Sequence, residues 1–162
     1  MAELTVLEDK LGEVIGLAMA AQGATDKVAG LTEDQELVRQ LEQMQEEARE
    51  TEERGTRFAE ALDGKKTAVL EKARETKGEA TEMMSTYLGS DADALDGFEF
   101  LTMAEAAEVG HWSVLRKLNE RAGDEDLEKL IAWALPIQQR HFEEVKDGSV
   151  KLAGLEDPGE PA

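Results

Sequence analysis

The sequence has no cysteine, and its 162 residues include only three prolines, two histidines and few aromatic residues. Without cysteine, the chain cannot form disulfides or zinc–thiolate sites, and thiol catalysis is excluded. The scarcity of proline and aromatic residues, beside abundant Ala, Glu, Leu, Lys and Gln, favours helix over sheet. No alternating segment bounded by turn residues indicates a strand. The sequence therefore predicts an all-α fold.

Basic residues and long apolar runs are also scarce. Lysine and arginine number 18 against 37 aspartates and glutamates, which gives a net charge of −19. So acidic a chain is unsuited to nucleic acid and to anionic membranes. The longest apolar stretch, "VIGLAMAA", is too short to span a bilayer, and "MAELTVLEDK" has no basic n-region of a secretory signal. We expect a cytoplasmic protein with no nucleic-acid or membrane partner.

Apolar residues at helical spacing, interrupted by turn residues, predict five helices in one domain, residues 1–154, followed by a disordered tail, residues 155–162. The expected helices span about 3–29, 32–62, 65–88, 92–121 and 124–153. Short turns join the first two helices and the last two, so each pair is expected to form an antiparallel hairpin. Two hairpins joined by a long crossover, here with its own helix, are typical of a ferritin-like four-helix bundle. An up-down bundle of five helices and an extended array of hairpins remain alternatives.

Local signals suggest where these helices begin, end and pack. "TEDQ" predicts a capping box with Thr32 as N-cap and Gln35 reaching back to it. Ser90 or Asp91 is expected to cap the fourth helix, and Gly123 to end it in the left-handed conformation.

Within the expected helices, Gly12, Gly16 and Gly23 either weaken the first helix or let a neighbouring helix approach. Pro136 lies inside the fifth helix, where the missing N–H and the ring predict a kink.

The main functional signal is a set of polar residues on faces that should point into the core. Each histidine follows a Glu or Gln by three positions, the spacing that places two side chains on one helix face. Ionised carboxylates buried without partners cost several kcal/mol, so such a set requires a cation, shared protons or pairing with Arg or Lys. Carboxylate and imidazole ligands suit iron or manganese. The candidate metal ligands are Glu8, Glu105, Glu108, His111, Gln138 and His141.

A structural role for the same residues stays open. The histidines would then be edge-of-core residues bonded to a neighbouring carboxylate or carbonyl. Glu105 and Glu108 would form a solvated edge or an internal salt bridge with Arg116 or Arg140.

Three segments resemble the bacterial ferritin-like stress-protein family of the YciF type. "LEDKL" at 7–11 resembles the first-helix segment in which a Glu, here Glu8, faces the site. "AEAAEVGHWSVLRKLNERAG" resembles the fourth helix, with Glu105 and Glu108 at its acidic positions. "LEKLIAWALPIQQRHFEEV" resembles the last helix, with Gln138 and His141 at places three apart. The resemblance covers most of the chain and implies a ferritin-like fold with a helix in the crossover.

The chain departs from the family pattern at two of the metal-binding positions. "EEAR" on the second helix places Glu46 first and Arg49 where the family has His, and Gln138 replaces an acid. Gln is a weak neutral ligand and Arg is never a ligand, although Arg49 can neutralise a carboxylate internally. The resemblance therefore implies a degenerate centre.

We expect a stress-associated, ferritin-like homodimer with a degenerate iron or manganese site. The reaction expected of such a site is weak oxidase or peroxide chemistry. The sequence does not assign an enzymatic activity or a substrate. The alternative is a non-enzymatic scaffold or interaction protein with a polar core and no metal. A third class is a small-molecule binder with its site near Pro136 and Gly55.

Overall fold

A computed structural model describes residues 2–162, which contain five α-helices and no strand. The helices are α1 (Val6–Leu31), α2 (Gln35–Glu60), α3 (Lys66–Tyr87), α4 (Ala94–Ala122) and α5 (Glu125–Ala153). The all-α prediction is confirmed, and the expected bounds are right to within about three residues. Among the described residues, no helix combines the length and the apolar character needed to cross a membrane.

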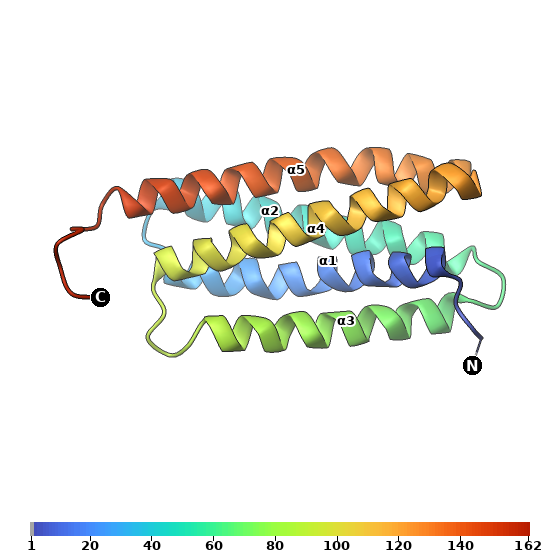
Figure 1. Ribbon diagram of the computed structural model, residues 1–162, viewed down its shortest axis with the longest axis horizontal. Helices are drawn as coiled ribbons and strands as arrows, with labels where there is room; N and C mark the ends of the chain where they lie inside the picture. Colours follow the sequence, from blue (N-terminus) through green and yellow to red (C-terminus); the bar gives the residue numbers. More distant parts are fainter. Residues whose placement is uncertain (1) are drawn as a thin grey trace.

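The five helices lie side by side along one common axis, and α3 lies against α1 (Figure 1). Contacts between helices fix their directions. Glu13 bonds to His111, and Gly97 lies against Val28, so α1 and α4 are antiparallel. Lys151 pairs with Asp34 near the start of α2, and Arg140 pairs with Glu47 further along, so α2 and α5 are antiparallel too.

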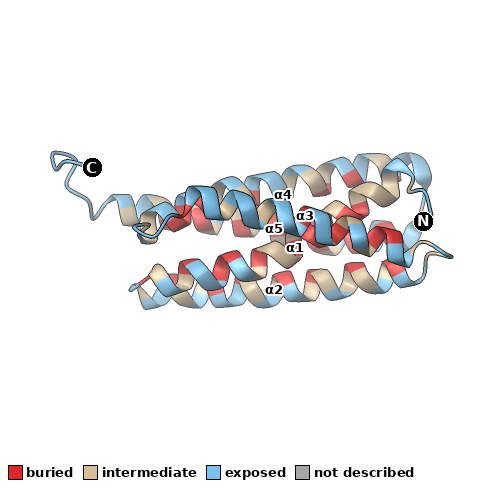
Figure 2. Ribbon diagram, turned by 90° about the horizontal axis from the view of Figure 1, so that it is seen from below, coloured by how far each residue is buried: buried red, intermediate tan, exposed pale blue. Residues whose placement is uncertain are grey.

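The interior consists of two apolar clusters with a polar layer between them. One cluster gathers around Trp112, Leu115 and Ile131, and the other around Phe98 and Leu41. Buried residues line the faces that the helices turn toward one another, and exposed residues cover the outside (Figure 2). Along α4 and α5, the segments between the two clusters carry four of the six polar residues singled out from the sequence, namely Glu105, Glu108, Gln138 and His141. The fold therefore places these residues at mid-length of the bundle.

Two of the predicted N-caps are wrong. Asp34, not Thr32, caps α2, because its carboxylate accepts hydrogen bonds from the first free N–H groups of that helix, those of Glu36 and Leu37. Thr32 instead ends α1, and its hydroxyl donates to the Val28 carbonyl. Asp93, rather than Ser90 or Asp91, caps α4 in a reciprocal capping box with Asp96.

The turn between α4 and α5 is stabilised by a left-handed glycine and by hydrogen bonds from one side chain of α4. Gly123 adopts the left-handed conformation, with φ 71°, as predicted. The Asn119 side chain closes the turn: its Nδ2 donates to the Asp124 carbonyl at 2.9 Å, and its Oδ1 accepts from the Asp124 N–H at 3.2 Å. Asp124 in turn caps α5, so one short segment ends one helix and starts the next.

Two of the four glycines of α1 let α3 pack against it. A Cβ atom added at Gly16 would lie 2.3 Å from the Ala73 carbonyl oxygen, and one at Gly12 would lie 2.8 Å from the Lys72 side chain. Nothing lies within 4 Å of the position that a Cβ at Gly23 would take. The close-approach interpretation therefore holds for Gly12 and Gly16 but not for Gly23.

We predict that Gly16→Ala lowers the free energy of unfolding by about 1–3 kcal/mol, because the new methyl group meets backbone that cannot yield without shifting α3. The control Gly23→Ala makes the same change in the same helix without a neighbour, so it should raise stability by up to about 1 kcal/mol. Urea denaturation of both variants measures the difference. Equal effects of the two substitutions would contradict the close packing of α1 on α3.

Candidate functional site: a polar layer across the bundle

Four polar residues from α4 and α5 meet in the middle of the bundle. Glu105 and Glu108 are 2% and 4% exposed, and Gln138 and His141 are each 1% exposed. Both pairs have the i, i+3 spacing that turns two side chains toward one side of a helix. The inward orientation predicted from helical phase is confirmed for these four residues.

The Gln138 amide links the two glutamates. One of its terminal atoms lies 2.9 Å from Glu105 Oε2 and 3.1 Å from Glu108 Oε2. If that atom is Nε2, the amide donates one hydrogen bond to each carboxyl group. If it is Oε1, three oxygen atoms face one another, and only acidic protons or a cation between them would hold them together.

The His141 ring lies between two carboxylates. Its Nδ1 is 3.7 Å from Glu105 Oε2, and its Nε2 is 3.7 Å from Glu47 Oε1. Both distances are too long for hydrogen bonds. His141 Nε2 and Glu47 Oε1 have no hydrogen-bond partner among the described residues, although both atoms are buried. Polar atoms left in this state are rare in protein interiors, so this end of the layer is incompletely satisfied.

Glu47 connects the layer to the surface. Its Oε2 accepts a hydrogen bond from the Arg140 guanidinium, which also lies 3.4 Å from Glu144 Oε1. The sequence suggested Arg49 for an internal neutralising role. Arg49 instead lies outside the core, where it pairs with Glu46 and Glu53. Arg140, on the opposite hairpin, takes that role because α2 and α5 pack side by side at this level.

Burial dominates the ionisation of the layer. It raises the pKa of Glu105 to about 8, with a further contribution from the negative charge of Glu144. Burial also raises the pKa of Glu108 well above its ordinary value, and Glu105 adds to that effect. Burial lowers the pKa of His141, although the carboxylates of Glu47 and Glu108 oppose the shift. At neutral pH, this pattern describes protonated acids beside a neutral imidazole.

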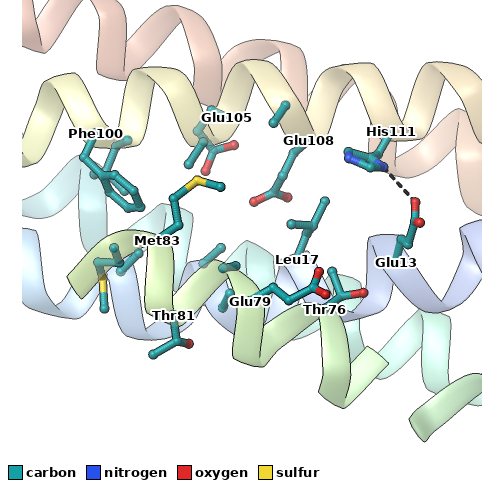
Figure 3. A pocket seen from close by; sticks show the side chains of 18 of the residues that line it. Glu13, Leu17, Thr76, Glu79, Thr81, Met83, Phe100, Glu105, Glu108 and His111 are labelled. Carbon is teal, nitrogen blue, oxygen red and sulfur yellow. Dashed lines mark hydrogen bonds and ion pairs between the residues drawn. The ribbon is translucent and has the colours of Figure 1, made fainter. Parts of the chain in front are cut away.

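Two of the six predicted ligands lie elsewhere. Glu8 is in the first turn of α1, where it forms a capping box with Thr5 and lies 3.3 Å from Lys65 Nζ. His111 Nδ1 contacts Glu13 Oε2 at 3.0 Å across α4 and α1, and its side chain is 39% exposed (Figure 3). His111 follows Glu105 by six residues, about 9 Å along the helix, and Glu8 lies beyond the level of His111. The structure therefore does not bring Glu8 into the layer, and His111 stands apart from it.

A centre for two metal ions does not fit this arrangement. The buried residues of α1 include no carboxylate or histidine, and Arg140 engages Glu47. Within residues 2–162, no group of three or more histidine, cysteine, aspartate or glutamate side chains is placed to hold a metal ion.

The atoms around Gln138 suit a single hard cation only when Oε1 faces the two carboxyl groups, the orientation in which the amide lacks complementary hydrogen-bond partners. Oxygens that share an octahedral divalent ion at about 2.1 Å lie roughly 3 Å apart. The separations of the Gln138 terminal atom from Glu105 and Glu108 have this size. Carboxylate, amide and imidazole donors suit manganese and iron.

Comparisons with known proteins do not assign a family to the chain. No protein-family model matches it, and neither a curated protein nor a solved structure gives a significant match.

We predict that the polar layer makes the protein less stable as pH rises. Glu105 has a pKa of about 8 in the folded state and an ordinary value of 4.5, so between these values the folded state binds a proton that the unfolded state has lost. Raising the pH therefore favours the unfolded state. The free energy of unfolding should therefore fall as pH rises from 4.5 toward 8. Glu105→Gln, which mimics the protonated acid, should remove much of this slope.

Urea denaturation between pH 5 and pH 8 tests this expectation, with Glu99→Gln as a control at an exposed carboxylate of the same helix. The lowered pKa of His141 acts in the opposite direction and is common to all three proteins. Parallel stability profiles for the original chain and Glu105→Gln would refute the assignment of a neutral Glu105.

Proposed function

We propose that this chain is a ferritin-like, stress-associated helical-bundle protein with a degenerate centre that holds one manganese or iron ion. Glu105, Glu108 and Gln138 would hold the ion, with His141 beside them. Iron bound there would supply one-electron redox chemistry, whereas the chain itself supplies the oxygen and nitrogen donors, all from side chains that are at most 4% exposed. The homodimer, the stress role and the cytoplasmic location are parts of this proposal that rest on the sequence resemblance.

The directions of the helices support the ferritin-like part of the proposal. The first and last helices, α1 and α5, run one way, and α2 and α4 run the other way. The connection from α2 to α4 returns along the length of the bundle and includes α3, which packs on α1. Ferritin-like bundles combine two hairpins with such a long crossover, and their metal ligands project inward from facing helices.

The geometry around Gln138 is the observation that carries the metal part of the proposal. Two carboxyl oxygens approach one atom of the amide at about the spacing of oxygens around a shared ion, in a buried site with no lysine or arginine in contact with either carboxyl. A divalent cation there would balance the negative charge that burial otherwise disfavours. The overall charge of −19 also attracts cations.

We predict that Mn(II), or Fe(II) under anaerobic conditions, raises the melting temperature of the protein by about 5–10 °C at a concentration near 100 times its dissociation constant. Glu105→Ala and His141→Leu should each remove most of this gain. His111→Leu makes the same substitution at the histidine outside the layer, so it should retain the gain.

Thermal denaturation with and without metal, together with metal analysis after gel filtration, measures these effects. No retained metal and no gain in melting temperature at millimolar concentrations would refute the metal proposal. Equal losses in His111→Leu and His141→Leu would refute the location.

A metal-free structural role is the second candidate, and the other orientation of Gln138 favours it. With Nε2 between the glutamates, the amide and two protonated acids form a neutral hydrogen-bonded layer that joins α4 to α5. Such a layer would fix the register of the bundle without any ion, as buried polar groups do in some coiled coils.

Gln138→Glu separates the two candidates. If the site holds metal, a third carboxylate should strengthen Mn(II) binding about tenfold or more, because an ionised ligand replaces a neutral one. If the layer is structural, the same variant should lose at least about 1–3 kcal/mol of stability, because it buries another acid and removes the donor. Metal titration and urea denaturation of the variant give the two readouts.

A further inference from the structure

A cavity of about 250 Å³ lies between α1, α3 and α4, and no residue of α5 lines it (Figure 3). It is not where the sequence suggested a small-molecule site. Ile15 packs over Gly55, at 2.6 Å from the position of an added Cβ, and Pro136 is exposed on α5. Neither Pro136 nor Gly55 lines this cavity, and the space at Gly55 is filled by Ile15.

Small side chains on two helices create this cavity. Ala20, Ala21 and Ala24 line it from α1, and Ala104 and Ala107 line it from α4. Larger apolar side chains complete the wall, namely Leu17, Met83, Met84, Phe100 and Leu101. Its volume is just below the range of about 300–1,000 Å³ usual for ligand sites, so it suits one small molecule.

Acidic side chains outnumber basic ones in the wall of the cavity. Glu105 and Glu108 are almost completely buried in its wall, and Glu79 lies at its exposed margin. Figure 3 shows the Glu108 carboxyl group directed toward Leu17, into the space between the helices. The wall therefore combines an apolar surface with buried acids.

The two basic residues of the wall already have acidic partners. Lys72 lies 3.7 Å from Asp9 and 3.8 Å from Glu75, and His111 contacts Glu13. Neither Glu105 nor Glu108 contacts a lysine or an arginine. An anionic ligand would find no free cation here, whereas a cationic ligand would find two carboxyl groups that have no lysine or arginine partner.

We propose that this cavity binds a small hydrophobic organic cation, such as an alkylammonium or arylalkylammonium ion, with its charged group at Glu108 and its apolar part among the alanine and methionine side chains. Hydrogen bonds to charged groups are stronger than those between neutral groups, so the cation gains more from the buried acid than a neutral analogue does. The Phe100 ring and the methionine sulfur atoms add a polarisable surface. This site goes beyond the proposed metal centre, with which it shares Glu105 and Glu108.

Three probes with the same eight-carbon chain test the chemistry. Isothermal titration of the full-length, metal-free chain with octylammonium, octan-1-ol and octanoate separates charge from hydrophobicity. Octylammonium should bind at least about tenfold more tightly than octan-1-ol, and octanoate more weakly than either. Octanoate binding as tight as octylammonium binding, or no octylammonium binding at millimolar concentration, would overturn the proposal.

Matched variants test the location. Ala104→Trp fills the cavity and should abolish octylammonium binding, whereas Ala132→Trp makes the same change on the exposed surface of α5 and should leave it unchanged. Methyl NMR gives a readout that does not depend on a variant: octylammonium should shift the Met83 and Met84 signals but not that of Met44, which lies in the core. Binding that persists in folded Ala104→Trp, or shifts confined to other residues, would exclude this cavity.

His141→Leu distinguishes this proposal from the metal proposal, because His141 does not line the cavity. If both proposals hold, this variant loses Mn(II) binding and keeps octylammonium binding within about twofold. Loss of octylammonium binding in folded His141→Leu would contradict the separate location of the cavity. Octylammonium binding without Mn(II) binding in the original chain would refute the metal proposal alone.

Discussion

The need to stabilise carboxyl groups in the middle of the bundle is the constraint on which the rest of the interior depends. Glu105 and Glu108 lie between two apolar clusters, and neither forms an ion pair with a lysine or an arginine. Isolated charge at this depth is too unfavourable to persist, so the acids must share protons, accept hydrogen bonds or bind a cation. The positions of Gln138 and His141, and the link from Glu47 to Arg140, follow from this requirement.

The absence of large or polar side chains from much of the buried face of α1 determines the packing around the polar layer. Its buried face is largely glycine, alanine and aliphatic residues, which bring α3 close at Gly16 and leave a cavity a few residues further on. In a metal-binding bundle of the two-ion type, this helix would also carry a carboxylate. One helix therefore contributes no buried carboxylate or histidine to the polar layer and opens the wall of the neighbouring cavity.

The helical periodicity correctly predicted that Glu105, Glu108, Gln138 and His141 point into the core, because in a long regular helix the same face stays directed toward the core over many turns. It failed for Glu8, where local capping prevailed: Thr5 precedes Glu8 by three positions, a capping-box signal that is readable in "TVLE". Glu47 could not be selected from a helix face with several neighbouring glutamates, because only packing against α5 distinguishes it. The cavity depends on where α3 settles, which local sequence patterns do not encode.

The turn at Gly123 between α4 and α5 determines which residues of the two helices lie at the same level of the bundle. Glu105 and His141 each lie 18 residues from Gly123, and Glu108 and Gln138 each lie 15 residues from it. Two residues of an antiparallel hairpin lie at the same level only when they are the same number of residues from the turn. One residue inserted into one helix displaces the residues beyond it by about 1.5 Å along the helix axis and rotates them by roughly 100° about it. The length of an exposed turn, at least 15 residues from the buried acids, thus sets which polar side chains can meet at all.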